Sequence, residues 1–260
     1  SNGGERESVI TLKSPREIEI MRRANVIVAE ILEELKSRVA PGVTTLELDA
    51  LAEELTYKKK ARPAFKGYAV GSQVFPRALC TSINEEVVHG IPAERALYEG
   101  DIIGLDFGVV YEGFYGDSAV TVSVGEVSNT ASHLMRVTEE ALYTGIEQLQ
   151  EGKRLGDLSA AVQKTIEGAG FSVVRVFVGH GIGKKLHEEP PVPNYGEPDR
   201  GLRLVEGLVL AIEPMANAGG YEVEIKEDGW TAVTKDRSLA AHFEHSVAIT
   251  KNGPYILSKL

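Results

Sequence analysis

Two aspartates, Asp106 and Asp117, stand near the ends of two apolar segments and are eleven positions apart. The segment 102–110 is rich in β-branched residues, Glu112-Gly113 is a turn signal, and 114–124 is apolar again, which predicts an antiparallel hairpin. Directly opposed residues of such a hairpin share one sum of residue numbers. Whether that sum is 223 or 225, both carboxylates project from the same face.

Two ionised carboxylates on one face repel each other, by roughly 3 to 4 kcal/mol at about 4 to 5 Å and an effective dielectric near 20. The pair therefore needs a compensating cation or a shared proton. For an isolated pair there is also an ordinary interpretation, in which one aspartate caps the turn or forms an outward salt bridge. The rest of the chain must decide between them.

Three further titratable residues occupy similar places. His180 stands between two glycines at the end of an apolar segment, Glu213 follows the apolar run 208–212, and Glu244 lies beside another apolar segment. A lone histidine is most often an ordinary core or surface residue. This one occurs together with four carboxylates, each at or near the end of an apolar strand.

Other catalytic motifs fail in this sequence. The segment 179–185 lacks the spacing and the final Ser or Thr of a phosphate-binding Walker loop. The run 187–191 is not an HExxH zinc motif, because it ends in two prolines and cannot be helical. No GxSxG motif is present, and Cys80 has no obvious paired base, which gives only weak support for a cysteine nucleophile.

The elements that position these residues occur in the same order twice. Capping boxes at Ser14–Glu17 and Thr44–Glu47 predict two helix starts. Apolar spacing then predicts a loop over 63–77, a strand over 78–84, the hairpin, helices over about 128–150 and 158–166, and a strand over 172–178.

An internal repeat underlies this order. Residues 97–106 match residues 204–213 at an offset of 107, which places Glu213 over Asp106, and the helices match at an offset of 110. Neither half could easily bury its own sheet face, and no Pro/Gly/Ser-rich linker divides them. We therefore expect one domain over 10–260 with half-domains of about 10–125 and 126–260. Residues 1–9 are set aside as a disordered terminus or an expression remnant.

Composition narrows the class of protein. The chain has 260 residues, of which 43% are apolar and 25% charged, as in ordinary globular proteins. Its net charge of −10 argues against nucleic-acid binding, and the basic run 58–62 is more often a solvated helix end, although contact with RNA or a ribosome stays open. A single cysteine and no long apolar run lead us to expect a cytoplasmic protein without a membrane partner. We also expect a monomer.

As a set, these residues resemble the type I methionine aminopeptidases, of the pita-bread fold, from about residue 10 to 256. The fold implied is α+β, with two pseudo-symmetric half-domains that form a curved antiparallel sheet flanked by helices. The motifs that carry the resemblance are Ser82-Ile83-Asn84-Glu85 with His89-Gly90-Ile91-Pro92, Asp106 with Asp117, Gly179-His180-Gly181-Ile182-Gly183 with His187-Glu188-Glu189-Pro190, Ile212-Glu213-Pro214-Met215, Thr234-Lys235-Asp236-Arg237-Ser238 and Phe243-Glu244-His245.

The resemblance implies removal of the initiator methionine from nascent proteins and peptides with a small second residue. Hydrolysis would use a bridging water or hydroxide activated by two divalent metal ions, drawn from Co, Mn, Fe or Zn. Two such ions and a hydroxide nearly neutralise four carboxylates. In the family, Asp117 and Glu244 would bridge the metals, Asp106 would chelate one, and His180 and Glu213 would complete the other, with Glu213 also the proton shuttle.

The same resemblance implies the substrate contacts. His89 and His187 would touch the substrate, with His187 near the carbonyl oxygen, although packing of the loop is an alternative for His187. The chain departs from the common pattern in a longer loop before Cys80, in Leu186 in place of an aromatic residue, and in His242, whose role is open, in place of glutamine. The side-chain pocket would comprise Tyr68, Phe75, Cys80, Leu186 and Trp230, although Cys80 is nearly as well explained as core filler.

Two other functions compete with this one. Xaa-Pro aminopeptidases and prolidases share the fold and all five ligands, but they carry an extra N-terminal domain, for which the residues before Asp106 leave no room. A catalytically silent pita-bread module that binds peptides is the second alternative, and such modules typically lose ligands. Only 26 positions separate His187 from Glu213, which leaves no space for the insertion of type II enzymes.

Overall fold

The computed structural model describes residues 9–260, so the expectation for residues 1–9 lies, apart from Val9, outside the described residues. Its helices are α1 (Pro15–Arg38), α2 (Thr45–Lys58), α3 (Asn129–Ile146) and α4 (Leu155–Gly168). Its strands are β1 (Arg62–Pro63), β2 (Ala69–Val70), β3 (Gln73–Val74), β4 (Cys80–Ile83), β5 (Glu86–Val88), β6 (Ile102–Tyr111), β7 (Phe114–Ser123), β8 (Ser172–Val173), β9 (Gly179–Gly181), β10 (Glu188–Val192), β11 (Val209–Ile212), β12 (Met215–Asn217), β13 (Val223–Ile225), β14 (Ala232–Thr234), β15 (Ala240–His242), β16 (His245–Thr250) and β17 (Gly253–Ile256).

The β6–β7 hairpin has the predicted form. Its register sum is 225, with Asp106 opposite Ala119 and Asp117 opposite Gly108. Glu112 and Gly113 both have positive φ, at 48° and 83°, as the tight turn of a twisted hairpin requires. The two aspartates therefore share one face as diagonal neighbours rather than as a directly opposed pair.

The repeat seen in the sequence is present in the backbone. Strand order β4-β6-β7 in the first half corresponds to β9-β11-β16 in the second. The bridge between Thr44 and Ala96 has its counterpart between Arg154 and Arg203, at offsets of 110 and 107. The halves meet where Ala119 of β7 and Glu244 exchange two backbone hydrogen bonds, of 3.2 and 2.9 Å. The strands that carry the acidic residues thus lie against one another at the centre of the molecule.

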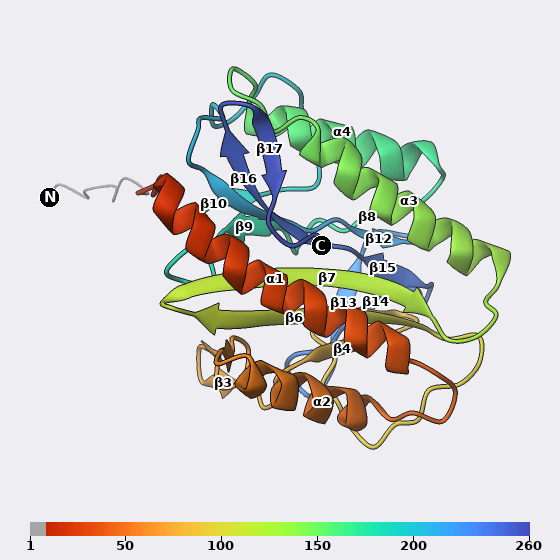
Figure 1. Cartoon of the computed structure of the whole chain (residues 1–260). Coiled ribbons are helices and arrows are strands. Elements are labelled where there is room, and N and C mark those ends of the chain that lie inside the picture. Colours follow the sequence, from red (N-terminus) through yellow and green to blue (C-terminus); the bar gives the residue numbers. More distant parts are fainter. Residues whose placement is uncertain (1–8) are drawn as a thin grey trace, which may run out of the picture.

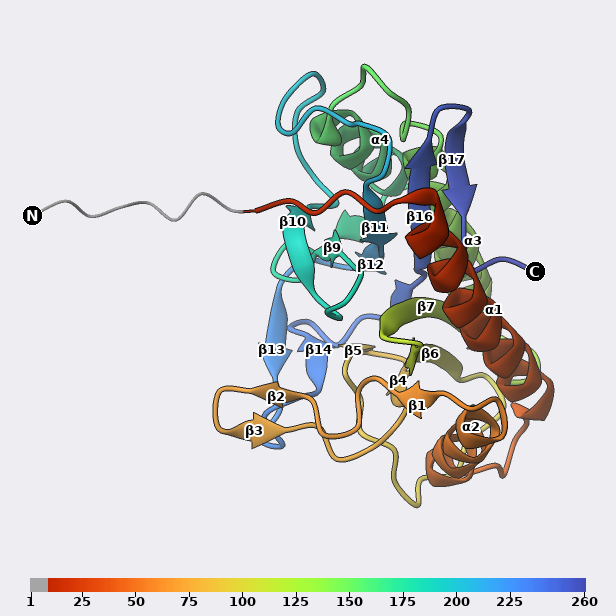
Figure 2. The ribbon, with the colours of Figure 1, turned by 60° about the vertical axis from the view of Figure 1, so that its left-hand side comes forward.

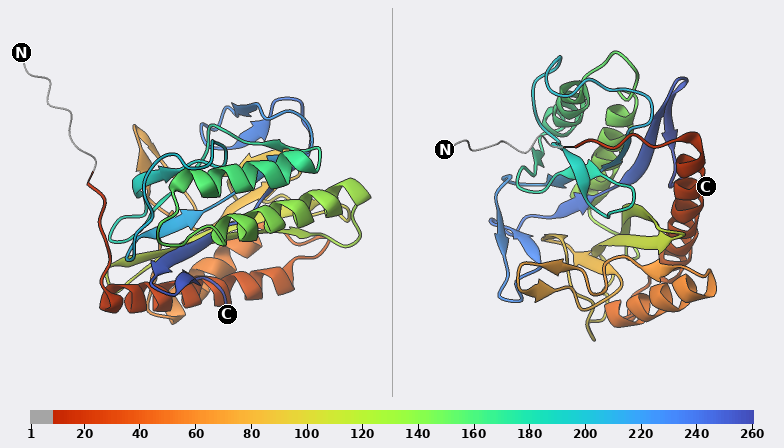
Figure 3. Two further views of the ribbon diagram at one scale, coloured as in Figure 1. Left: turned by 90° about the horizontal axis from the view of Figure 1, so that it is seen from above. Right: turned by 90° about the vertical axis from the view of Figure 1, so that its left-hand side faces the viewer.

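The helices cover one side of this sheet. Helix α1 lies along the β6–β7 hairpin, and α3 and α4 pack together over the second half (Figure 1). The short hairpins β2–β3 and β13–β14 lie on the side away from α1, α2 and α3 (Figure 2). The C-terminus returns to α1, where Arg22 donates to the carbonyl oxygens of Leu257 and Lys259 (Figure 3). Each half has its own apolar core between its helices and its strands.

Local sequence explains the ends of the helices. Ser14 and Thr44 each accept from the backbone of a glutamate three residues later, whose side chain bonds back, so both predicted capping boxes form. Helix α3 ends at Ile146, four residues before the predicted end at Gln150, because the chain tightens there into successive turns. No helix of residues 9–260 is long and apolar enough to cross a membrane.

Two further predictions were wrong in detail. The strand predicted over 172–178 is limited to Ser172–Val173. The Val174 N–H still donates to the Met215 carbonyl oxygen of β12 at 2.9 Å, but the chain then leaves that strand, so that Val176 is 71% exposed and Phe177 lines a cavity. The loop predicted over 63–77 begins at the second residue of β1 and contains the small β2–β3 hairpin.

Candidate active site

Five predicted ligand residues converge where the two halves meet. Asp106 comes from β6, Asp117 from β7 and His180 from β9, while Glu213 directly follows β11 and Glu244 directly precedes β16. The His180 Nε2 atom lies 3.4 Å from Asp117 Oδ2, 3.2 Å from Glu213 Oε2 and 3.8 Å from Glu244 Oε2. Glu213 and Glu244 lie at strand ends as predicted, whereas Asp106 and Asp117 lie within β6 and β7, because the hairpin continues past the cluster. The pairing of β7 with the segment at Glu244, and of β11 with β9 and β16, brings residues far apart in the sequence into one cluster.

The glycines beside His180 have a steric reason. A Cβ atom on Gly179 would lie 2.3 Å from the carbonyl oxygen of Ala211, and one on Gly181 would lie 2.3 Å from that of Glu189. Strand β9 lies between β10 and β11, and the backbones of these neighbours leave no room for a side chain at Gly179 or Gly181. The Gly-His-Gly run thus presents one imidazole from a closely packed strand.

Burial and mutual repulsion disfavour the charged forms of the carboxylates in this cluster. Burial raises the pKa of the Asp106 carboxyl well above its usual value, and Asp117 adds to the effect; burial and Asp117 raise the pKa of Glu244 in the same way. Burial opposes the charging of His180, but its contacts with Asp117 and Glu213 prevail and raise its pKa to about 10. Burial would also raise the pKa of Glu213, yet the hydrogen bond from His180 and the contact with His242 hold it well below normal. Burial and like charge thus both disfavour the ionised forms of Asp106 and Glu244, and nearby cations would offset this.

The residues fit divalent cations. Within residues 9–260, buried oxygens of Asp106, Asp117 and Glu244 have no hydrogen-bond partner, including both carboxylate oxygens of Glu244. The donor atoms form two sets, and within each set all atoms lie within 4.8 Å of one another. One set comprises Asp117, His180, Glu213 and Glu244, and the other comprises Asp106, His242 and Glu244. Carboxylates and imidazole are the ligands that divalent transition metals accept. Cations would therefore satisfy the buried oxygens that the protein leaves unpaired.

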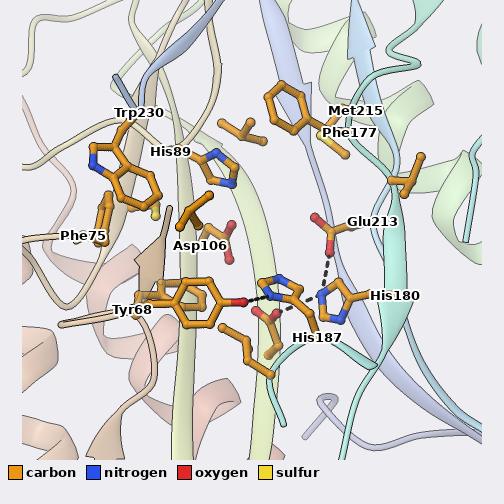
Figure 4. Close-up of a pocket in the computed structure, with 17 residues that line it drawn as sticks. Tyr68, Phe75, His89, Asp106, Phe177, His180, His187, Glu213, Met215 and Trp230 are labelled. Carbon is orange, nitrogen blue, oxygen red and sulfur yellow. Dashed lines mark hydrogen bonds and ion pairs between the residues drawn. The ribbon is translucent and has the colours of Figure 1, made fainter. Parts of the chain in front are cut away.

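A cavity of about 180 Å³ opens beside this cluster (Figure 4). The Tyr68 hydroxyl and His187 Nδ1 are 2.7 Å apart, and the rings of His187 and His180 lie edge to face at 4.3 Å. Phe75 and Trp230 pack edge to face on one side, with ring centroids 5.3 Å apart. His89 packs against Phe177 on another side, and burial lowers the pKa of His89 to about 4. The cavity is thus apolar with a few imidazoles directed inward.

The structure brings nearly all predicted site residues to this cavity. Glu244 is only 1% exposed and does not line the cavity, although its Oε2 atom lies 3.8 Å from Nε2 of His180, which does. The predicted pocket residues Tyr68, Phe75, Cys80, Leu186 and Trp230 all line the cavity. Sequence reasoning missed six lining residues: Phe65, Val70, Val88, Phe177, Val178 and Met215. Met215 was accessible from the sequence, because it lies two positions after Glu213 and so shares its face in an extended chain. Phe177 was hidden by the wrong strand prediction over 172–178.

Comparison with known proteins places the chain in a class. The model of metallopeptidase family M24 matches residues 19–251. The chain is 51% identical to the methionine aminopeptidase of Clostridium acetobutylicum over 251 residues, covering 96% of this chain and 99% of that protein. It is 49% identical to methionine aminopeptidase 1 of Bacillus subtilis over 252 residues, covering 97% and 100%.

Solved structures agree with this placement. The crystal structure of methionine aminopeptidase from Thermotoga maritima superposes with a TM-score of 0.94 at 48% identity and covers 97% of this chain and 100% of that one. The prolidase of Pyrococcus furiosus has the same fold, with a TM-score of 0.76 at 24% identity, but the match covers only 65% of its length. The chain belongs to metallopeptidase family M24 and, within it, to the methionine aminopeptidases. Its activity is the metal-dependent removal of an N-terminal methionine.

Proposed function

We propose that two divalent metal ions bind at the cluster of Asp106, Asp117, His180, Glu213 and Glu244 and support the hydrolysis of the first peptide bond of a nascent protein. The observation that carries the proposal is the set of buried, unpartnered oxygens at the edge of an apolar cavity. When bound, such ions would acidify a water molecule and polarise the scissile carbonyl. The metals themselves, among Co, Mn, Fe and Zn, are to be identified by measurement.

The protein's own residues would orient the reaction. Glu213 extends from the end of β11 into the cavity, where it would take a proton from the attacking water and give it to the leaving amine. The ring of His187, held by the Tyr68 hydroxyl at 2.7 Å, would donate towards the carbonyl oxygen as negative charge develops. His89 would contact the substrate while neutral, because its burial holds its pKa near 4.

The cavity would accept the methionine side chain. Aromatic rings and the buried Cys80 thiol offer apolar, polarizable contacts that suit an unbranched thioether. Tyr68 and His187 line the cavity together, with ring centroids 5.3 Å apart, and would limit the space for the second residue of the substrate. We therefore propose that a small second residue is required.

A peptide-release assay tests this function. The protein, stripped of metal and then supplied with Co or Mn, is offered Met-Ala-Ser, Met-Lys-Ser and Ala-Pro-Ser. Fast release from Met-Ala-Ser alone is expected. Cleavage of Ala-Pro-Ser only would favour the prolidase-like alternative, equal rates on the two methionine peptides would contradict the size limit, and no release from any peptide would favour a silent peptide-binding module.

Several features of the cellular setting stay proposals. We propose a cytoplasmic monomer with residues 10–125 and 126–260 as half-domains of one catalytic unit. In the basic run 58–62, Lys58 pairs with Glu54 and Lys59 with Glu30, so part of its charge is neutralised locally. This lessens the case for ribosome docking through that run. Sedimentation with purified ribosomes at low and physiological salt would test it.

A further inference from the structure

His242, which the five-ligand scheme leaves without a role, lies inside the metal-binding cluster. It is the last residue of β15 and is only 3% exposed. Its backbone is fixed from both sides by one side chain: Thr121 Oγ1 accepts from the His242 N–H at 2.9 Å and donates to its carbonyl oxygen at 2.8 Å. Glu244 follows two positions later. The backbone that carries the imidazole is therefore rigidly held against β7.

The ring of His242 points at the carboxylates. Its Nε2 atom lies 3.4 Å from Glu213 Oε1, while His180 Nε2 approaches the other oxygen of the same carboxylate at 3.2 Å. Within residues 9–260, His242 Nε2 is a buried atom without a hydrogen-bond partner. A buried imidazole nitrogen without a partner is costly unless something else binds it.

The donor atoms divide into two sets, and each set contains one imidazole. His180 belongs with Asp117, Glu213 and Glu244, whereas His242 belongs with Asp106 and Glu244. Glu244 is common to both, and neither of its oxygens has a hydrogen-bond partner among the described residues. The set around Asp106 would provide oxygen ligands alone if His242 were not part of it.

We propose that His242 is a sixth ligand of the metal centre and gives the cation position at Asp106 and Glu244 a nitrogen donor. This inference rests on the proposed two-metal function. Carboxylate oxygens alone suit Mg, Ca and Mn, whereas imidazole favours Fe, Co and Zn. His242 thus strengthens the binding of these later transition metals at the position that would otherwise discriminate least against Mg and Ca.

Metal binding to the complete, metal-free protein tests the inference. Co is titrated by calorimetry into the wild-type chain and into His242→Gln, which keeps a polar side chain but removes the imidazole. We expect two ions in the wild type. In the variant, the Kd of one ion should rise by about tenfold or more, because one group that supports a metal site is lost. The Kd of the other ion should change by less than about twofold. X-ray absorption of the protein with two Co ions should count two imidazoles in the wild type and one in the variant.

A matched control is available in the same cavity. His89 is an imidazole that lines the cavity but belongs to neither donor set, so His89→Gln should leave both Kd values and the imidazole count unchanged. If His242→Gln does not fold, as judged by circular dichroism of the metal-free protein, His242→Asn takes its place, and the imidazole count of the wild type is decisive alone.

The outcomes separate this inference from the function on which it rests. Two bound Co ions with one imidazole in the wild type, or unchanged Kd values in His242→Gln, would overturn the role of His242 and leave the two-metal function standing. In that case His242 Nε2 merely donates to Glu213. A wild-type protein that binds no Co would overturn both.

Discussion

The two halves of the sheet have the same strand order but present different side chains. In the first half, Thr81-Ser82-Ile83 of β4 pairs with residues 103–105 of β6. Residues 103–105 correspond to residues 210–212 of β11 at the offset of 107. There, Gly181 pairs with Leu210 and His180 with Ala211 of β11, and the same register places Gly179 opposite Ile212. Ser82 thus occupies the place that His180 has in the other half.

This difference follows from what surrounds each strand. Strand β4 pairs with β6 on one side only in its sheet, whereas β9 lies between β10 and β11. Enclosure excludes side chains beside His180, and only glycine fits there. The shared scaffold brings the acidic residues together, and the enclosed strand β9 presents an imidazole at the place where β4 has a hydroxyl. A symmetric fold can in this way hold two chemically different cation positions.

The largest expected effect comes from removing one acidic ligand from each half. Asp106→Asn in the first half and Glu244→Gln in the second should each lower kcat by about 10³-fold or more, because both carboxylates would hold the metals in place. The steady-state rate at which Met-Ala-Ser is cleaved to methionine and Ala-Ser measures kcat for each variant. A loss in only one of the two variants would mean that a single half supplies the working site.

Two controls keep the interpretation clear. Glu94→Gln, an exposed carboxylate outside the cluster, should leave kcat unchanged. Circular dichroism should show that Asp106→Asn and Glu244→Gln remain folded, because burial favours the uncharged form of both residues when no cation is bound.

A second prediction concerns the enclosed strand. Gly179→Ala places a Cβ atom 2.3 Å from the Ala211 carbonyl oxygen, so strands β9 and β11 must separate, and the free energy of unfolding should fall by about 3 kcal/mol. Urea denaturation of the metal-free protein measures it. Gly168→Ala at the end of α4, where nothing lies within 4 Å, is the matched control and should stay within about 1 kcal/mol of the wild type. Equal stabilities would mean that β9 is not tightly enclosed.

A third prediction uses the titration of His89 in the first half. Its pKa is about 4 in the folded protein against an ordinary value of 6.5, so below pH 6.5 the unfolded chain binds more protons than the folded one. Stability attributable to this residue is therefore full above pH 6.5 and falls as the pH drops towards 4, by roughly 2 kcal/mol after allowance for partial exposure of the ring. Thermal unfolding of the metal-free wild type and His89→Gln across pH 4–8 compares the two. Parallel curves would contradict the burial of His89.

Local patterns in the sequence were sufficient for much of this architecture. The predictions that succeeded depend on residues close in sequence or on a fixed offset. They are the two capping boxes, the shared face of Asp106 and Asp117 in the β6–β7 hairpin, and the repeat that aligns Glu213 with Asp106. The resemblance placed five residues of the cavity wall correctly, but Phe177 and the position of His242 beside the carboxylates did not follow. Phe177 reaches the cavity from a segment without regular structure, and His242 is positioned by the bonds of its backbone with Thr121. Contacts of that kind depend on how separate elements pack, which no periodicity records.

The smallest expected effect compares the starts of α2 and α4. Thr44 accepts from the Glu47 N–H at 3.1 Å, but its counterpart at the start of α4 is Arg154, whose side chain cannot accept, so only the Asp157 carboxylate completes that end. Thr44→Ala should therefore lower the free energy of unfolding by about 1 kcal/mol, and Arg154→Ala, which loses only exposed contacts, by about half of that or less. Urea denaturation of both variants in one buffer resolves the difference. Equal losses would mean that the two helix starts are supported alike, and that the asymmetry between the halves is confined to the metal-binding strands.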